Sequence, residues 1–166
     1  MFQKIALALV LVVAVLLVLT VLAGQAGLLS GKPRANLGVF DGRLKPPSKT
    51  PNSVSSQASL YPDHPQHDYA LIEPLPVKPG MDPQAALARV AEVVQGMTGM
   101  VVVLRQDGYL YVQARTRLLG FVDDVEFWFN PEKNAIDVRS ASRLGRKDYG
   151  ANRRRIEAIR AALQGV

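Results

Sequence analysis

The hydrophobic positions of the chain form one long apolar run near the N-terminus and shorter periodic segments after residue 80. Residues Ile5 to Ala23 are apolar except for Thr20. At about 1.5 Å per residue, a helix of this length spans roughly 28 Å, close to the hydrocarbon thickness of a bilayer. We therefore predict a single-pass transmembrane helix within residues 1–29. The alternative is a secretory signal peptide cleaved near Gly24-Gln25-Ala26, although the run is longer than the usual signal.

Two later segments have the apolar spacing of amphipathic helices. Asp82 is a typical N-cap and Pro83 a typical first helical residue, so we predict a helix over 83–97. Its apolar residues recur at helical spacing, at Leu87, Val90, Ala91 and Val94. A second helix is expected over 151–164, where one stripe holds Ile156, Ile159 and Leu163.

Two β-hairpins are predicted between these helices. Segments 100–106 and 109–115 flank Asp107-Gly108, a strong type I′ turn signal. Segments 124–129 and 135–140 form the second pair, joined by a proline-containing turn.

The register of the second hairpin follows from its charges. Pairing Phe127 with Val138 places Glu126 opposite Arg139, whereas a slip of two residues would oppose Glu126 to Asp137. Opposed like charges are unfavourable, so the first register is expected. The predicted fold is an α+β two-layer domain, with a four-stranded antiparallel sheet and two flanking helices behind the N-terminal membrane helix.

A proline-rich region separates the apolar run from the first amphipathic helix. Nine of the 11 prolines lie between residues 30 and 80, and proline removes a backbone donor and disfavours helix before it. We expect a linker over 30–36 and a single globular domain over 37–166. Within that domain, residues 37–80 would form an irregular strap and residues 81–166 the α+β core.

Composition excludes several classes of chemistry. The 166 residues include no cysteine, which excludes a disulfide scaffold, a thiol nucleophile and a cysteine-ligated metal. The only histidines, His64 and His67, have no third ligand suggested by the sequence, so we predict no metal and no cofactor. A G-x-S-x-G motif is also absent, which gives hydrolase chemistry no support.

The net charge of +6 is confined to the C-terminal segment. From Arg139 onward there are eight basic and two acidic residues, while the first 138 residues are balanced. This asymmetry points to an anionic partner or to a solvated helix face. Nucleic acid is not expected, because Arg153, Arg154 and Arg155 would spread around a helix and lack aromatic neighbours for base stacking.

The segment from Arg139 to Lys147 is the best anion-binding candidate. Arginine forks, serine hydroxyls and a following helix N-terminus are groups that hold phosphate or carboxylate. The candidate residues are Arg139, Ser140, Ser142, Arg143 and Arg153. The alternative, which we favour, is that these arginines pair with Asp123, Asp124 and Glu126 and fasten the last helix to the sheet.

Three motifs in order resemble a known family. They are Asn52-Ser53-Val54-Ser55-Ser56-Gln57, Phe121-Val122-Asp123-Asp124-Val125-Glu126-Phe127 and Val138-Arg139-Ser140-Ala141-Ser142-Arg143-Leu144-Gly145, followed by Asp148, Gly150, Asn152, Arg153 and Arg155. With these motifs, residues 37–163 resemble the family catalogued as domain of unknown function 1499. Its members occur in bacteria, often behind an N-terminal membrane segment or signal, and in plastids. The resemblance implies no biochemical activity.

The resemblance also marks a polar signature and one departure from it. The implied signature is Asn52, Ser55, Ser56, Asp123, Asp124, Glu126, Arg139, Ser140, Ser142, Arg143, Asp148, Asn152 and Arg153. We expect Asn52, Ser55 and Ser56 to act in the strap, and Asp148 and Asn152 to join a structural cluster with the three carboxylates and Arg139, Arg143 and Arg153. The family usually has a cysteine on each side of its Pro-Asn pair, where this chain has Pro47 and Ser53.

Together these observations lead to a functional hypothesis. The chain is expected to be a membrane-anchored protein of the bacterial inner membrane with its domain on the periplasmic side. Its partners would be the membrane and an anionic ligand or another protein, bound without catalysis through the arginine-rich segment. Two alternatives stay open: an enzyme of unknown class that uses the Asp/Glu/Arg cluster, and a module that binds lipid head groups.

Overall fold

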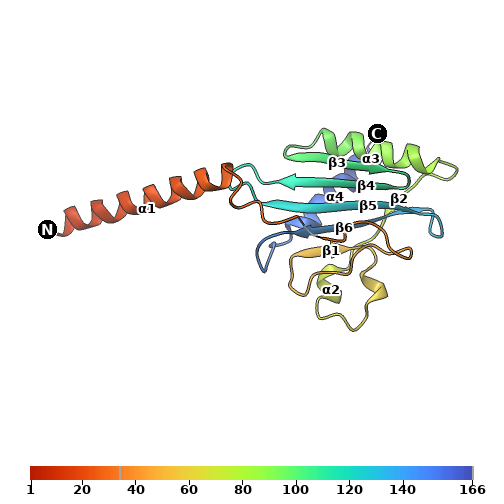
Figure 1. Ribbon diagram of the computed structural model, residues 1–166, viewed down its shortest axis with the longest axis horizontal. Coiled ribbons are helices and arrows are strands. Elements are labelled where there is room, and N and C mark those ends of the chain that lie inside the picture. The colour runs from red at the N-terminus through yellow and green to blue at the C-terminus, as the bar shows by residue number, and fades with distance from the viewer. Residues whose placement is uncertain (34, 166) are drawn as a thin grey trace.

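The computed structural model describes residues 1–33 and 35–165, and it shows one long helix projecting from a mixed α/β domain (Figure 1). Arg34, in the predicted linker, and Val166 lie outside the described residues. The helices are α1 (Phe2–Gln25), the one-turn 3₁₀ helix η1 (Ala58–Leu60), α2 (His67–Ala70), α3 (Pro83–Gln95) and α4 (Ala151–Gln164). The strands are β1 (Ser53–Ser55), β2 (Leu75–Pro76), β3 (Met100–Gln106), β4 (Tyr109–Arg115), β5 (Val122–Asn130) and β6 (Ala135–Ser142).

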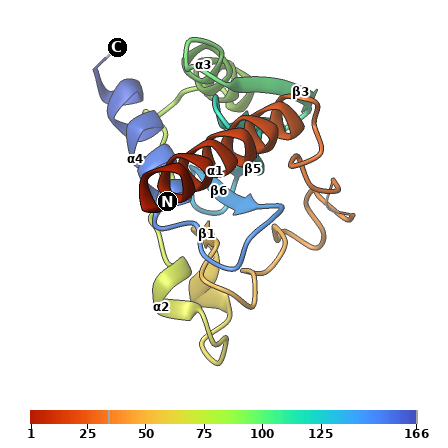
Figure 2. The same ribbon diagram turned by 90° about the vertical axis from the view of Figure 1, so that its left-hand side faces the viewer.

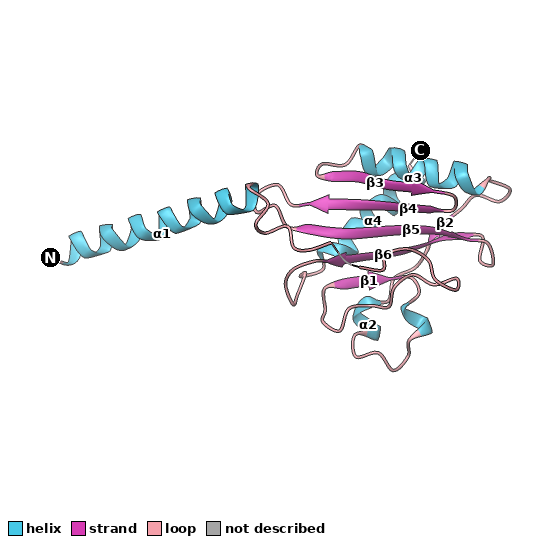
Figure 3. Cartoon of the chain, viewed as in Figure 1, coloured by secondary structure: helices cyan, strands magenta, loops and turns pink. Residues whose placement is uncertain are grey.

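The sheet has six strands, so the prediction of four was wrong in number. Its order is β1-β6-β5-β4-β3, with β2 also paired to β6, and the pairs are antiparallel. Both additional strands come from the strap, which Figure 3 otherwise draws mainly as loop. They have three and two residues, too short to produce an alternating pattern that a sequence could reveal.

The two predicted hairpins and the register of the second are confirmed. Phe127 pairs with Val138 and Glu126 with Arg139. β6 continues to Ser142, two residues beyond its predicted end, because its last residues pair with both β5 and β1.

The two long helices of the domain begin where the sequence predicts. The Asp82 carboxylate accepts hydrogen bonds from the backbone N–H groups of Gln84 (2.9 Å) and Ala85 (3.0 Å), which satisfies two donors of the first turn of α3. α4 follows Gly150, whose left-handed φ of 78° lets the chain turn sharply into the helix.

The two faces of the sheet are covered by different material. α3 and α4 bury the main apolar core against one face, through residues such as Leu87, Val90 and Ile156. On the other face, Leu44 of the strap packs against Tyr109 and Tyr111 in a small second cluster. Figure 2 shows α4 and the N-terminal part of the strap on opposite sides of the domain.

The N-terminal helix α1 extends away from the domain (Figures 1 and 2). By length and composition it is able to cross a membrane, and nearly all its side chains are outside the protein core. Its C-terminal end contacts the β4–β5 loop, residues 116–121, which also marks one end of the sheet.

Candidate functional site

A row of charged side chains lies between the sheet and the strap. Glu126 and Arg139 form an ion pair of 3.2 Å, and both side chains are completely buried. The other carboxylate oxygen of Glu126 accepts hydrogen bonds from the Tyr109 hydroxyl (2.9 Å) and from the backbone N–H of Gly38 (2.8 Å). Burial and the nearby carboxylate of Glu126 raise the pKa of Tyr109, so its hydroxyl remains a donor. This pair therefore joins two strands to the strap.

A second ion pair lies beside the first. Arg143 donates to Asp124 Oδ1 from both Nε (3.0 Å) and Nη2 (2.8 Å), and the Tyr111 hydroxyl donates to the same oxygen (2.6 Å). Burial opposes the charge of Arg143, but the hydrogen bonds and charge of Asp124 outweigh it and raise the pKa of the guanidinium. The guanidinium of Arg143 is thus bound to the carboxylate of Asp124.

A third buried carboxylate, Asp137, fixes the strap. It accepts from the Ser56 hydroxyl (2.6 Å), from Gln57 Nε2 (3.0 Å) and from Asn130 Nδ2 (2.8 Å). The Gln57 side chain also accepts from the backbone N–H of Leu44 (2.7 Å), deeper in the strap. Asp137 was not among the predicted site residues, since an aspartate in a strand has no motif of its own.

On the helix face, a polar cluster connects the sheet to α4. Arg155 binds Asp123 Oδ2 at 2.5 Å and donates to Asn152 Oδ1 (2.7 Å) and to the Ser140 hydroxyl (2.8 Å). Asn152 is fully buried and donates through Nδ2 to the Ser142 hydroxyl (3.1 Å). Arg155, rather than Arg153, therefore pairs with the sheet.

Asp148, just before α4, gathers hydrogen bonds from several elements. It accepts from the Tyr69 hydroxyl and from the backbone N–H groups of Gly150 (3.1 Å) and Asn152 (2.9 Å). Burial alone would raise the pKa of this carboxyl, but these hydrogen bonds outweigh burial and lower it. Gly150, the N-cap residue of α4, has no side chain to accept these hydrogen bonds. The Asp148 carboxylate accepts them instead.

The remaining candidates hold the strap and the loops near it. Asn52 donates from Nδ2 to the carbonyl of Gly145 (2.7 Å), and the Ser55 hydroxyl accepts from the backbone N–H of Gln57 (3.2 Å). Arg153 donates to the carbonyls of Tyr69 (2.8 Å) and Leu71 (2.9 Å).

Ser53, at one position where the resembling family usually has a cysteine, supplies a local tie. Its hydroxyl accepts from the backbone N–H of Ser48 (2.8 Å). This hydrogen bond links the chain next to Pro47 with Ser53, the two positions of the missing cysteine pair.

An open pocket of about 280 Å³ lies at the end of the sheet nearest α1. Its walls come from the β4–β5 loop and from the β6–α4 loop, residues 143–150. Apolar and polar side chains both line it, chiefly Phe121, Asp123, Ser142, Leu144, Lys147 and Tyr149. We call this the membrane-proximal pocket.

Tyr149 has an unusual position beside this pocket. Its backbone is left-handed, with φ of 51°, and its side chain is 84% exposed. Together with Lys147 it also lines a second open pocket of about 360 Å³ that includes Tyr69. A large aromatic side chain that is exposed on a residue with an uncommon backbone conformation is typical of a surface that binds another molecule.

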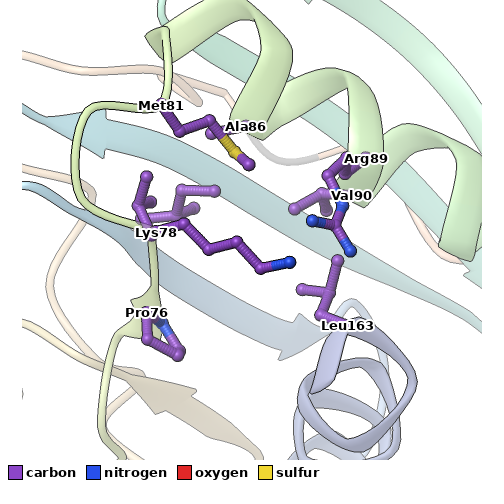
Figure 4. A pocket seen from close by; sticks show the side chains of 9 residues that line it. Pro76, Lys78, Met81, Ala86, Arg89, Val90 and Leu163 are labelled. Atoms are coloured by element: carbon purple, nitrogen blue, oxygen red, sulfur yellow. The ribbon is translucent and has the colours of Figure 1, made fainter. Parts of the chain in front are cut away.

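A smaller pocket lies between β2, α3 and the end of α4 (Figure 4). Lys78 and Arg89 line it together with apolar residues such as Val90 and Leu163. Its volume is about 50 Å³, against about 280 Å³ for the membrane-proximal pocket, so it offers much less room for a ligand.

Comparison with known proteins places most of the chain in one family. Residues 43–163 match the family model described as "Protein of unknown function (DUF1499)". The chain belongs to the DUF1499 family. No curated protein and no solved structure matches it.

The geometry shows what the polar residues of this DUF1499 domain can do. Asp123 lies on one face of β5 and Asp124 and Glu126 on the other, and each binds a different arginine, so the three carboxylates do not converge on one reaction centre. Within residues 1–33 and 35–165, no three metal-binding side chains come together. The arrangement neutralises buried charge and ties strands, strap and α4 into one unit.

Sequence reasoning missed the open part of the DUF1499 domain. Of the polar signature, Asp123, Ser142 and Asp148 line the membrane-proximal pocket, whose exposed lining residues include Phe121, Leu144 and Tyr149. The available signal was the Asp148-Tyr149-Gly150 turn, where a large aromatic precedes a helix without belonging to an apolar stripe.

Proposed function

We propose that this protein is a single-pass protein of the bacterial inner membrane that presents a non-catalytic binding domain on the periplasmic side. Its ligand site would be the membrane-proximal pocket. α1 serves as the uncleaved anchor, and the pocket holds a small molecule that reaches the membrane surface.

The observation that carries this proposal is that the acidic residues lining the pocket are already bound to other residues of the domain. Asp123 is paired with Arg155, and Asp148 holds Tyr69 and the first turn of α4. Groups fixed in this way form stable walls for a ligand, and each already serves a structural partner within the domain. Phe121, Leu144 and Tyr149 add apolar contact area, and Lys147 adds a cation. These groups favour a small anionic or amphiphilic ligand.

A ligand screen on the full chain in detergent tests the proposal. Unfolding is followed by differential scanning fluorimetry on the single tryptophan, Trp128, against anionic metabolites, fatty acids and soluble phospholipids. A ligand at 100 times its Kd stabilises the folded state by about 2.7 kcal/mol.

Two leucines of equal exposure provide the matched variants. Leu144 lines the pocket and Leu60 lies in η1, and both are 43% exposed. Leu144→Ala should remove most of the stabilisation by the ligand, and Leu60→Ala should retain it. The proposal is wrong if no compound stabilises the chain, or if both variants respond equally.

A further inference from the structure

The end of α1 is fixed to the domain by a joint of hydrogen bonds. Gln25 Nε2 donates to the carbonyls of Arg117 (2.8 Å) and Leu118 (2.9 Å) in the β4–β5 loop. In return, Arg115 donates from Nη2 to the carbonyls of Gly24 and Gln25, each at 3.2 Å. A cation at the C-terminus of a helix also interacts favourably with the helix dipole. The end of α1 therefore contacts the domain directly and is not joined to it only through the linker.

Two glycines allow this close approach. A Cβ on Gly24 would lie 2.3 Å from the carbonyl oxygen of Leu119, and a Cβ on Gly120 would lie 2.3 Å from the carbonyl oxygen of Gly24. Gly120 also has a left-handed φ of 63°. The loop and the helix thus meet backbone to backbone, with no room for a side chain on either of these residues.

The joint places this end of the domain at the level of the bilayer surface. The apolar run from Ile5 to Ala23 occupies the hydrocarbon core when α1 spans it, and Gly24 follows directly. Figure 1 shows the long strands running between the end of the domain next to α1 and the opposite end, and the β4–β5 and β6–α4 loops lie at the end next to α1. These loops therefore lie beside the lipid head groups.

Large apolar side chains are exposed on these loops. Leu118 is 63% and Leu144 43% exposed, and Phe121 and Tyr149 are also exposed. Tyrosine is enriched at membrane interfaces, where its ring contacts apolar lipid and its hydroxyl remains hydrated. Exposure of these side chains to water would be unfavourable, whereas contact with a bilayer would bury them.

The charge at the same end is predominantly basic. Segments 26–33, 116–121 and 143–150 contain Lys32, Arg117, Arg146 and Lys147, besides Arg143, which is paired with Asp124, and one acidic residue, Asp148. At the opposite end of the sheet, the two hairpin turns carry Asp107, Glu132 and Lys133, a net charge of −1. A bilayer that contains anionic lipid would therefore attract the end beside α1 more strongly than the opposite end, which orients the domain.

We propose that this end of the domain is a lipid-contact surface that rests on the anionic head groups of the bilayer in which α1 is inserted. We define the lipid-contact surface by its exposed residues Arg117, Leu118, Phe121, Leu144, Arg146, Lys147 and Tyr149. This inference goes beyond the membrane-proximal pocket as a ligand site and does not depend on a ligand being found there. A protein partner on the same surface would be the alternative occupant.

Fluorescence quenching in nanodiscs of the full chain tests the contact directly. In a Trp128→Phe background, Leu118→Trp places the single tryptophan on the surface, and Glu132→Trp places it at the opposite end. Lipids brominated near the head group should quench most of the emission of the first variant and almost none of the second. Equal, weak quenching of both variants would overturn the proposal and leave the surface to a protein partner.

Hydrogen exchange tests the preference for anionic lipid. Segments 116–121 and 143–149 should exchange more slowly in phosphatidylglycerol nanodiscs than in phosphatidylcholine nanodiscs. Each basic residue near an anionic surface contributes about fivefold to binding, so Lys147→Glu should reduce this difference by at least about fivefold. Arg105→Glu, at an exposed residue near the opposite end, is the matched control and should leave it unchanged. If amide protection of these segments is equal in both lipids, or if both variants change it equally, the proposed attraction to anionic lipid is wrong.

Discussion

At the scale of single residues, the charged pairs of β5 and β6 are held by a balance between desolvation and attraction. Removing Glu126 and Arg139 from water costs several kcal/mol for each ion, and their attraction and hydrogen bonds offset that cost only while both are present. The intact pair therefore adds little to the net stability of the fold, whereas removal of either member alone is strongly destabilising. The difference between single and double variants tests this explanation.

Arg139→Ala should destabilise the domain by about 3–5 kcal/mol, because it leaves Glu126 buried without a counter-charge. The free energy of unfolding measured in urea checks this value. Arg105→Ala, at an exposed arginine, should change it by less than about 0.5 kcal/mol. The double variant Glu126→Gln with Arg139→Met removes both charges but keeps an acceptor for Tyr109 and Gly38, so it should regain part of the loss; a double variant as unstable as Arg139→Ala would contradict the explanation.

Asp148 should make stability depend on acid pH. Its pKa in the folded state lies below the ordinary value of 3.8, so it stabilises the fold above that pH and loses the contribution as pH falls through the folded pKa. Asp148→Asn should cost about 1–3 kcal/mol at neutral pH. The difference from the wild type should shrink in urea titrations below about pH 4. Asp63→Asn, at an exposed carboxyl, is the control, and a difference that stays constant with pH would exclude this role.

The residue scale also shows where sequence reasoning reaches its limit. The opposition of Glu126 and Arg139 could be predicted because strand register is a local property with a period of two. The partner of Asp123 could not, because Arg153 and Arg155 flank the apolar stripe of α4 on opposite sides. The stripe shows which face of α4 is buried, but the flank that faces Asp123 depends on the direction in which α4 crosses the sheet, and this is known only from the folded chain.

At the scale of elements, long periodic segments were predictable and short paired ones were not. α3, α4 and the two hairpins each carry a cap, a turn signal or an apolar stripe. β1 and β2 exist because β6 offers them an unpaired edge, and no propensity of their own marks them. The membrane-proximal pocket was missed for the same reason, since it is formed by two loops that meet only in the folded chain.

The joint between α1 and the β4–β5 loop should be sensitive to a single methyl group. Gly24→Ala places a Cβ against the Leu119 carbonyl, and overpacking of this kind typically costs about 1–3 kcal/mol. Amide exchange of residues 116–121 in nanodiscs should accelerate, while the core strands keep their protection. Gly96→Ala, whose Cβ would lie 3.5 Å from the nearest atom, is the same substitution without the clash. Unchanged exchange in Gly24→Ala would show that the joint does not form.

At the scale of the whole molecule, the joint bears on the two interpretations of the N-terminal segment. A signal peptidase acting after Ala26 would remove Gly24 and Gln25, and with them the hydrogen bonds that join α1 to Arg115 and to the β4–β5 loop. The proposed lipid-contact surface would then lose the helix that holds it beside a membrane. These contacts support the proposal that α1 remains part of the mature protein.

The absence of cysteine makes the topology of the whole chain directly measurable. Gln3 lies in the first turn of α1 and Glu132 in the β5–β6 turn, which Figure 1 shows at opposite ends of the molecule. The single-cysteine variants Gln3→Cys and Glu132→Cys each introduce the only thiol of the chain. With the outer membrane opened and the inner membrane intact, an impermeant maleimide should label Glu132→Cys, and Gln3→Cys only after lysis. The basic residues that follow α1, such as Lys32, mildly favour the opposite orientation by the positive-inside rule, so the labelling tests the proposed orientation against a contrary charge signal. The labelled protein should retain the 18.1 kDa mass of the uncleaved chain. The reverse labelling would place the domain in the cytoplasm, and a shorter mature chain would mean that α1 is a signal peptide.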